Sequence, residues 1–96
     1  MSGAHDPIGS AARTELDRLT HRWHTLPVGQ ARSGTVHLRA LASELLGGSV
    51  DDLGPATALD QVRVGVYEAA RAGADDAVLG ERLAHLRRTL AAAPHA

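Results

Sequence analysis

The sequence predicts an all-α protein, a four-helix bundle, and three observations support this. Alanine and leucine dominate the apolar residues, and strand-forming residues are sparse outside one valine-rich run at 62–66. Apolar residues recur three and four positions apart in four segments, which is the periodicity of amphipathic helices. Turn-forming residues separate these segments. We expect helices near 10–26, 28–46, 56–72 and 75–92, most simply antiparallel in up-down-up-down order.

A chain of 96 residues is long enough for one domain with a modest core. The chain has no Phe, one Trp and one Tyr, so Leu, Val and Ala must build that core. Residues 1–9 show no periodic pattern and are interpreted as a flexible arm. The domain is expected at residues 10–92, followed by a tail at 93–96.

The first helix should begin at Ser10, a favourable N-cap residue, and end at Pro27. Apolar residues four and three positions apart form its seam, namely Ala12, Leu16, Leu19, Trp23 and Leu26. The second helix is ambiguous at its start. The phase of its apolar face continues back through Gly34, which predicts a start near Val28. The alternative is a loop as far as Ser33, followed by a short helix.

The segment from Pro55 to Gly73 is apolar around most of its circumference, which is typical of a buried helix. Three sides can be distinguished. One carries Leu59 and neighbouring valines, and a second carries the small residues Ala58, Gly65, Ala69 and Ala72. On the third side lie Val64 and Tyr67, flanked by Asp60 and Arg71.

The loop 47–54 is rich in turn formers, and Gly47 and Gly48 should end the second helix. Val50 and Leu53 could pack beneath the end of the bundle. Gly73 suits the left-handed position after a helix, and Asp75 and Asp76 suit the start of the next. The last helix carries the most regular seam of the chain, at Leu79, Leu83, Leu86 and Leu90.

Composition excludes several classes of protein. Without Cys there are no disulfides and no thiolate nucleophiles or ligands. No apolar run is long enough to span a bilayer, and no secretory signal precedes the first helix, so we expect a cytoplasmic protein without a membrane role. The net charge of −1 argues against a protein that coats nucleic acid. The basic residues are all Arg, a bias that resembles high-GC genomes such as those of actinobacteria.

Asp17, His21 and His24 form the candidate metal site, because their spacing places them together on one side of the first helix. Imidazole and carboxylate groups can ligate Zn²⁺ and other divalent ions. The trio lies away from the apolar seam, so a solvated polar face is the simpler interpretation. No zinc-hydrolase, nucleophile-elbow or phosphate-loop motif occurs, and we expect no cofactor.

Arg82, Arg87 and Arg88 are the candidate nucleic-acid contacts. Their segment, LGERLAHLRRTL, resembles the first helix of lambda-repressor-type helix-turn-helix domains. The turn and recognition helix of that family do not follow in this sequence. A second stretch, from Glu44 to Ala69, resembles the first loop and second helix of acyl carrier proteins. Gln61 stands where that family has the Ser that carries its prosthetic arm, so carrier activity is not implied.

Close packing is the feature from which we predict function. Ala77, Ala84 and Ala91 recur every seven residues on the last helix, away from its leucine seam. With Val64, Tyr67 and Arg71 they form the predicted interaction surface. We expect a non-catalytic interaction or regulatory bundle that pairs with itself or with a protein partner. A metal- or small-ligand-binding bundle and a DNA-associated regulator are the alternatives.

Overall fold

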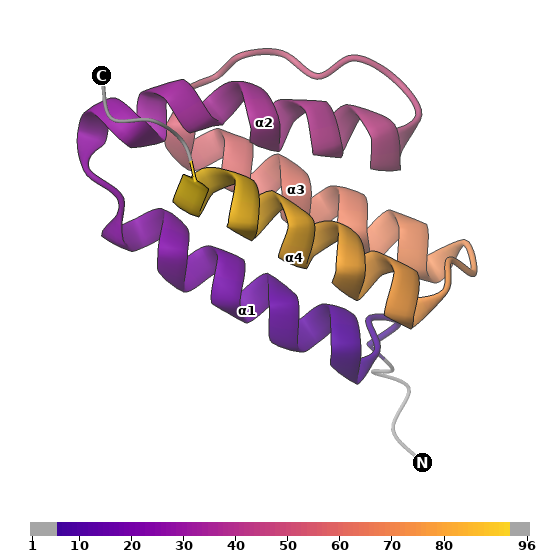
Figure 1. Cartoon of the computed structure of the whole chain (residues 1–96). Helices are drawn as coiled ribbons and strands as arrows, with labels where there is room; N and C mark the ends of the chain where they lie inside the picture. The colour runs from indigo at the N-terminus through magenta and orange to yellow at the C-terminus, as the bar shows by residue number, and fades with distance from the viewer. Residues whose placement is uncertain (1–5, 93–96) are drawn as a thin grey trace.

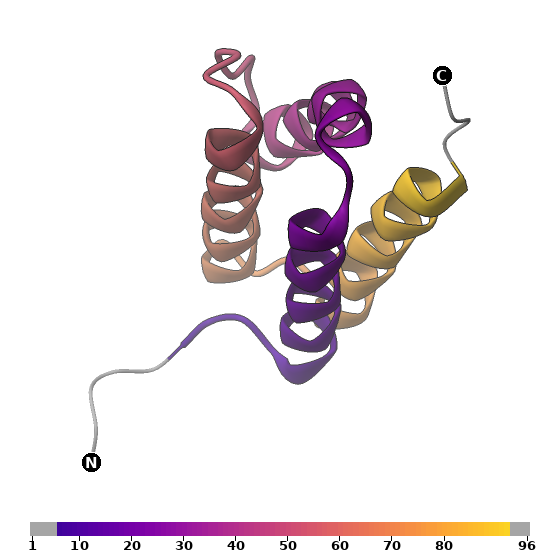
Figure 2. The ribbon, with the colours of Figure 1, turned by 90° about the vertical axis from the view of Figure 1, so that its left-hand side faces the viewer.

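The computed structural model describes residues 6–92, and these form four helices (Figure 1). They are α1 (Ser10–Thr25), α2 (Val28–Leu46), α3 (Pro55–Arg71) and α4 (Asp76–Ala92). The predicted all-α four-helix bundle is confirmed, and each helix end lies within one residue of its prediction. Two pairs of helices make the most extensive contacts, α1 with α4 and α2 with α3. Figure 2 shows the same pairing from a second direction.

The core is aliphatic with a single aromatic ring, as the composition requires. Each helix contributes one apolar seam to it. The predicted seams of α1 and α4 are buried, except that Leu26, which follows α1, is only partly buried. The buried apolar residues are Ala12, Leu16, Leu19 and Trp23 on α1; Leu38, Leu41 and Ala42 on α2; Ala58, Leu59, Val62 and Val66 on α3; and Leu79, Leu83, Leu86 and Leu90 on α4. This seam spacing explains why four helices share one core.

The direction of the helices differs from the expected up-down-up-down order. Near the end of α1, the Trp23 indole N–H donates to the Pro55 carbonyl at the start of α3, at 3.1 Å. Gly34, near the start of α2, lies against Trp23 and against Leu90 near the end of α4. At the opposite end of the bundle, Asp76 at the start of α4 contacts the start of α1. Helices α1 and α4 are therefore parallel to each other. Helices α2 and α3 are also parallel to each other, and they run in the opposite direction to α1 and α4 (Figure 1).

The loop 47–54 makes this order possible by returning along the length of α2 (Figure 1). Helix α2 has 19 residues, which corresponds to a length of about 28 Å. Eight extended residues reach about 26–29 Å, which is just enough. Halfway back, Arg39 donates to the Val50 carbonyl at 2.8 Å, and Gln61 donates to the Asp51 carbonyl at 3.0 Å. Val50 packs against the core, whereas Leu53 is exposed.

Helix α2 begins at Val28, so the longer of the two predicted forms is present. Gly34 is buried on its inner face. A Cβ there would lie 2.8 Å from Leu90 Cδ2 and 3.0 Å from Trp23 Cζ3. The glycine weakens the helix by about 1 kcal/mol relative to alanine, but it allows three helices to meet at this end.

The first turn of α1 is capped by a residue far away in the sequence. Ser10 makes no cap, and Gly9 occupies the N-cap position. The Asp76 carboxylate instead accepts hydrogen bonds from the Ala11 and Ala12 amides, both at 2.9 Å. A Cβ on Gly9 would lie 2.5 Å from Asp76 Cγ. Asp76 thus satisfies amides that have no partner within α1 and holds the starts of α1 and α4 together.

The turn between α3 and α4 follows its sequence signals. Gly73 adopts φ +100°, and the Ala74 and Gly73 amides donate to the Ala69 and Ala70 carbonyls, as in a Schellman motif. The Asp75 carboxylate then accepts from the Val78 amide at 3.1 Å, which caps α4 as predicted.

The predicted arm at residues 1–9 is described only from residue 6 onward. There Asp6 pairs with Arg13 at 2.6 Å, and Ile8 packs against the core. The predicted tail at 93–96 lies outside the described residues.

Candidate interaction surface

The outward side of α3 carries two exposed apolar side chains next to each other. Val64 is 53% exposed and Tyr67 is 43% exposed, although this helix also contributes four residues to the core. Asp60, Val64, Tyr67 and Arg71 are spaced by four, three and four residues, so they follow one line along the helix. We call these four residues the α3 face. The line points away from the buried Leu59, Val62 and Val66.

The two ends of the α3 face carry charged residues of opposite sign, Asp60 at one end and Arg71 at the other. Asp60 pairs with Arg63 at 3.3 Å, and Arg71 pairs with Glu68 at 3.0 Å. The hydrogen bond that Arg71 donates to Glu68, together with the negative charge of Glu68, raises the pKa of Arg71 above its ordinary value. Along the four residues of the α3 face, the order is thus a carboxylate, two apolar side chains and a guanidinium, and each charged group also has a neighbour of opposite charge on the same helix.

The small residues of α4 are used within the fold. A Cβ on Gly80 would lie 3.2 Å from the backbone of Ala11, and Ala84 is buried beside it. This side of α4 therefore packs on α1 at close range. Ala77 and Ala91, the other two alanines of the predicted surface, are exposed. They lie on a different helix from the α3 face, so the structure does not join the predicted residues into one surface.

The small side of α3 also packs internally. A Cβ on Gly65 would lie 3.0 Å from Leu45 Cβ and 3.7 Å from the Ala42 carbonyl oxygen. Gly65 thus allows α2 and α3 to approach closely, and Ala58 is buried in the core. These two helix pairs therefore account for Ala58, Gly65, Gly80 and Ala84, whereas Ala72, Ala77 and Ala91 are exposed.

The three candidate metal ligands line one open depression between α1 and α3. Asp17, His21 and His24 are all exposed there. Arg63 lines the same depression and donates to Thr20 Oγ1 at 3.2 Å, so a guanidinium lies near any cation bound there. Within residues 6–92, no three potential ligands are arranged to hold a metal ion. Metal binding by this trio stays a prediction.

The three candidate nucleic-acid contacts point to different partners. Arg82 forms a two-contact ion pair with Glu44 of α2. Arg87 lies 3.4 Å from Glu15 of α1, and Arg88 pairs at 2.7 Å with Glu81 of its own helix. Each arginine is thus next to a carboxylate, and the three do not form one basic surface.

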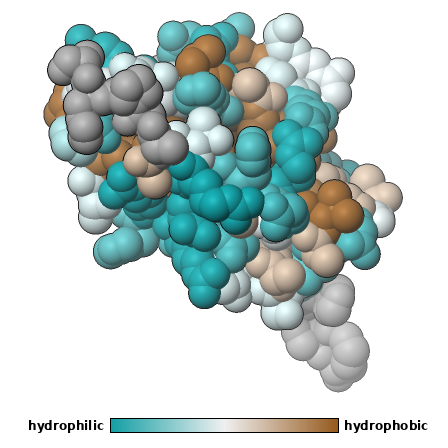
Figure 3. Space-filling view, viewed as in Figure 1, coloured by the Kyte–Doolittle hydropathy of each residue, from teal (hydrophilic) through white to brown (hydrophobic). Residues whose placement is uncertain are grey.

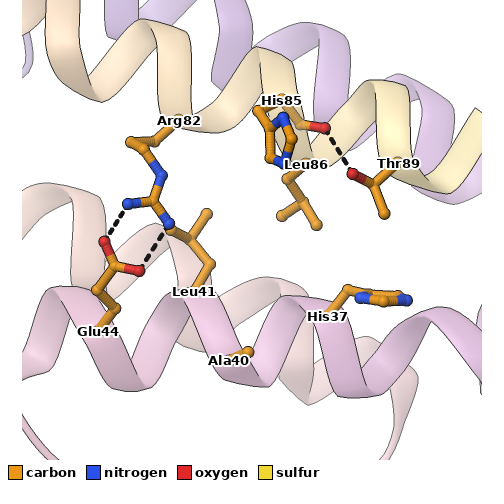
Figure 4. Close-up of a pocket in the computed structure, with 8 residues that line it drawn as sticks. All are labelled: His37, Ala40, Leu41, Glu44, Arg82, His85, Leu86 and Thr89. Atoms are coloured by element: carbon orange, nitrogen blue, oxygen red, sulfur yellow. Dashed lines mark hydrogen bonds and ion pairs between the residues drawn. The ribbon is translucent and has the colours of Figure 1, made fainter.

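A shallow pocket of about 200 Å³ between α2 and α4 combines residues that the sequence did not connect (Figure 4). His37 comes from α2 and His85 from α4, with the Glu44–Arg82 ion pair at the other end of the pocket. The Glu44 hydrogen bond raises the pKa of Arg82 above its ordinary value. Helical periodicity places each histidine beside the apolar seam of its own helix. Only the packing of α2 against α4 shows that both histidines line one pocket.

The side of the molecule occupied by α4 and α1 is mainly hydrophilic at its centre (Figure 3). Helix α3 lies behind these helices in that view, and Figure 2 shows it at the edge of the bundle. No helix in the described part of the chain is long and apolar enough to cross a membrane.

Comparisons with known proteins found no matching family model, curated protein or solved structure. The candidate surface therefore rests on the geometry of this chain. Of the features described, the α3 face combines exposed large apolar groups with an ordered pattern of charge.

Proposed function

We propose that this protein is a non-catalytic helical interaction module that associates with a second copy of itself through the α3 face. The observation that carries the proposal is the exposure of Val64 and Tyr67 as neighbours on a helix whose opposite side is buried in the core. No catalytic residue and no cofactor belong to this proposal. The cytoplasmic location expected from the sequence stays a prediction.

The physical reason is the gain from removing these side chains from water. Single exposed apolar residues are common and need no explanation. Val64 and Tyr67, however, are three residues apart on one line and so form a continuous strip. Tyr side chains are enriched at protein interfaces because they combine a large apolar ring with a hydroxyl that can hydrogen bond. Covering both residues stabilises an association without unfolding any part of the monomer.

The expected association is weak. A single pair of helices buries less surface than a standard stable interface, and only two large apolar residues per chain lie at its centre. We expect a dissociation constant on the order of 0.1 mM, which corresponds to about 5–6 kcal/mol. Concentrations up to ~1 mM are therefore needed to observe the dimer.

The proposal is tested by sedimentation equilibrium of the full chain and of a Val64→Gln/Tyr67→Gln variant. The average mass of the wild type should approach that of a dimer as concentration rises to ~1 mM, whereas the variant should stay monomeric. Val36→Gln on α2 is the matched control, because Val36 is 58% exposed but lies outside the α3 face. A wild type that is monomeric throughout, or a control that dissociates equally, contradicts the proposal.

A further inference from the structure

We infer that two copies pair with their α3 helices antiparallel, in a register that places Val64 against the partner's Tyr67 and Asp60 against the partner's Arg71. This inference rests on the proposed function and specifies its geometry. It follows from the order of charged and apolar residues along the α3 face. When two copies of this order are aligned in opposite directions, each acidic residue faces a basic one and each apolar residue faces an apolar one.

The spacing of the α3 face allows one twofold axis to generate all of these contacts. In an antiparallel helix pair, residue positions add to a constant across the axis. Asp60 and Arg71 add to 131, and Val64 and Tyr67 also add to 131. An axis midway between positions 65 and 66 therefore relates both sets of contacts at once. The 4-3-4 spacing is that of a coiled-coil seam, in which the two facing helices interdigitate. A twofold contact of this kind closes with two chains.

The charges at each end of this register alternate across the interface. Within one chain, Asp60 is 3.3 Å from Arg63, and Arg71 is 3.0 Å from Glu68. In the antiparallel pair, the order becomes Arg63, Asp60, the partner's Arg71 and the partner's Glu68. Each charge then neighbours charges of the opposite sign. The same four-charge chain occurs at both ends of the interface because of the twofold symmetry.

A parallel pair of α3 helices lacks this complementarity. It places Asp60 opposite the partner's Asp60 and Arg71 opposite the partner's Arg71, and like charges that face each other across an interface disfavour it. The antiparallel register is thus selected by repulsion in the alternative as well as by attraction. This self-complementary order is the reason that a second copy, rather than a different protein, is the partner of this face.

Charge reversal tests the register in the full chain. Asp60→Arg should raise the dissociation constant about tenfold, because it creates two repulsive contacts per dimer between exposed charges. Arg71→Glu should do the same. The double variant Asp60→Arg/Arg71→Glu should restore the dissociation constant to within about threefold of the wild-type value. A mixture of the two single variants should form a heterodimer more tightly than either variant forms a homodimer.

The outcomes separate this inference from the proposed function. Both side chains are exposed, so the variants should keep the helix content of the wild type, measured by circular dichroism. Single variants that dimerise like the wild type, or a double variant as weak as the single ones, overturn the register. If Val64→Gln/Tyr67→Gln abolishes the dimer while charge reversal has no effect, the α3 face is still the interface and only the proposed register is wrong. A monomeric wild type overturns both.

Discussion

The α1–α4 contact and the α3 face use different residues for different purposes. Between α1 and α4, Gly80 and Ala84 allow the backbones to approach, and the Asp76 carboxylate fixes the two helix starts. On the α3 face, large side chains are exposed and no helix covers them. Small residues at which two helices approach closely are covered and cannot contact a partner protein. Large exposed residues can. The first region therefore stabilises the fold, and the second is the surface that we propose for association.

The largest expected effect is on the α1–α4 contact. Gly80→Leu should lower the free energy of unfolding by about 3 kcal/mol, because its Cβ alone would lie 3.2 Å from the Ala11 backbone. Urea denaturation measures this change. Gly29→Leu is the control, since a Cβ at that position would meet no atom within 4 Å other than the backbone of its own helix turns and its chain neighbours. Equal stability of the two variants would contradict close packing at Gly80.

The capping contact should have the next largest effect. Asp76→Ala removes the acceptors of the Ala11 and Ala12 amides and should lower the free energy of unfolding by about 1–2 kcal/mol. Hydrogen exchange of these two amides should become faster. Asp75→Ala removes the cap of the Val78 amide instead and should leave the Ala11 and Ala12 amides protected. Unchanged exchange in Asp76→Ala would show that another group caps α1.

The ion pair across the α2–α4 pocket should contribute less. Arg82→Gln removes the contacts with Glu44, which lie in an exposed position, so the free energy of unfolding should fall by no more than about 1 kcal/mol. Thermal melts at low and high salt measure this difference, which should shrink as salt screens the pair. A loss that is independent of salt would instead indicate that Arg82 acts through packing.

Substitution on the α3 face should have the smallest effect on the monomer. Val64→Gln/Tyr67→Gln should change the free energy of unfolding by less than about 0.5 kcal/mol when measured at low micromolar concentration. The melting temperature of the wild type should rise with protein concentration, and that of the variant should not. A large loss of stability at low concentration would mean that this face contributes to the fold itself.

The helices were predictable because their signals are local. Seam spacing, Pro27, Gly47 and Gly73 locate the helix ends, and the phase continuity through Gly34 correctly favoured the long form of α2. The structure adds the reason for a glycine at this position, which is the close approach of Trp23 and Leu90.

The direction of the helices was not predictable for a geometric reason. Loop 47–54 can form a tight connection between antiparallel helices, and it is also just long enough to return along α2. Its sequence does not distinguish these conformations. Two contacts do distinguish them, because the loop is bonded both to Arg39 of α2 and to Gln61 of α3, and such contacts between segments are not encoded in the local pattern of the loop.

The candidate surface was predictable in part. Helical phase separated Val64 and Tyr67 from the core, and the structure exposes both. The same reasoning could not show which side of α4 would pack on α1, so Ala84 was included in the predicted surface although it is buried. Likewise, the tertiary cap by Asp76 and the pocket shared by His37 and His85 depend on contacts between helices.

A dilution series followed by amide NMR tests the central claim most directly, because it locates the contact without any substitution. Between about 1 mM and 20 μM, a range that spans the expected dissociation constant, the amide signals of Asp60, Val64, Tyr67 and Arg71 should shift together. Those of Val36 and its neighbours on the outward side of α2 should stay constant. Shifts confined to another helix, or a spectrum independent of concentration, would contradict self-association through the α3 face.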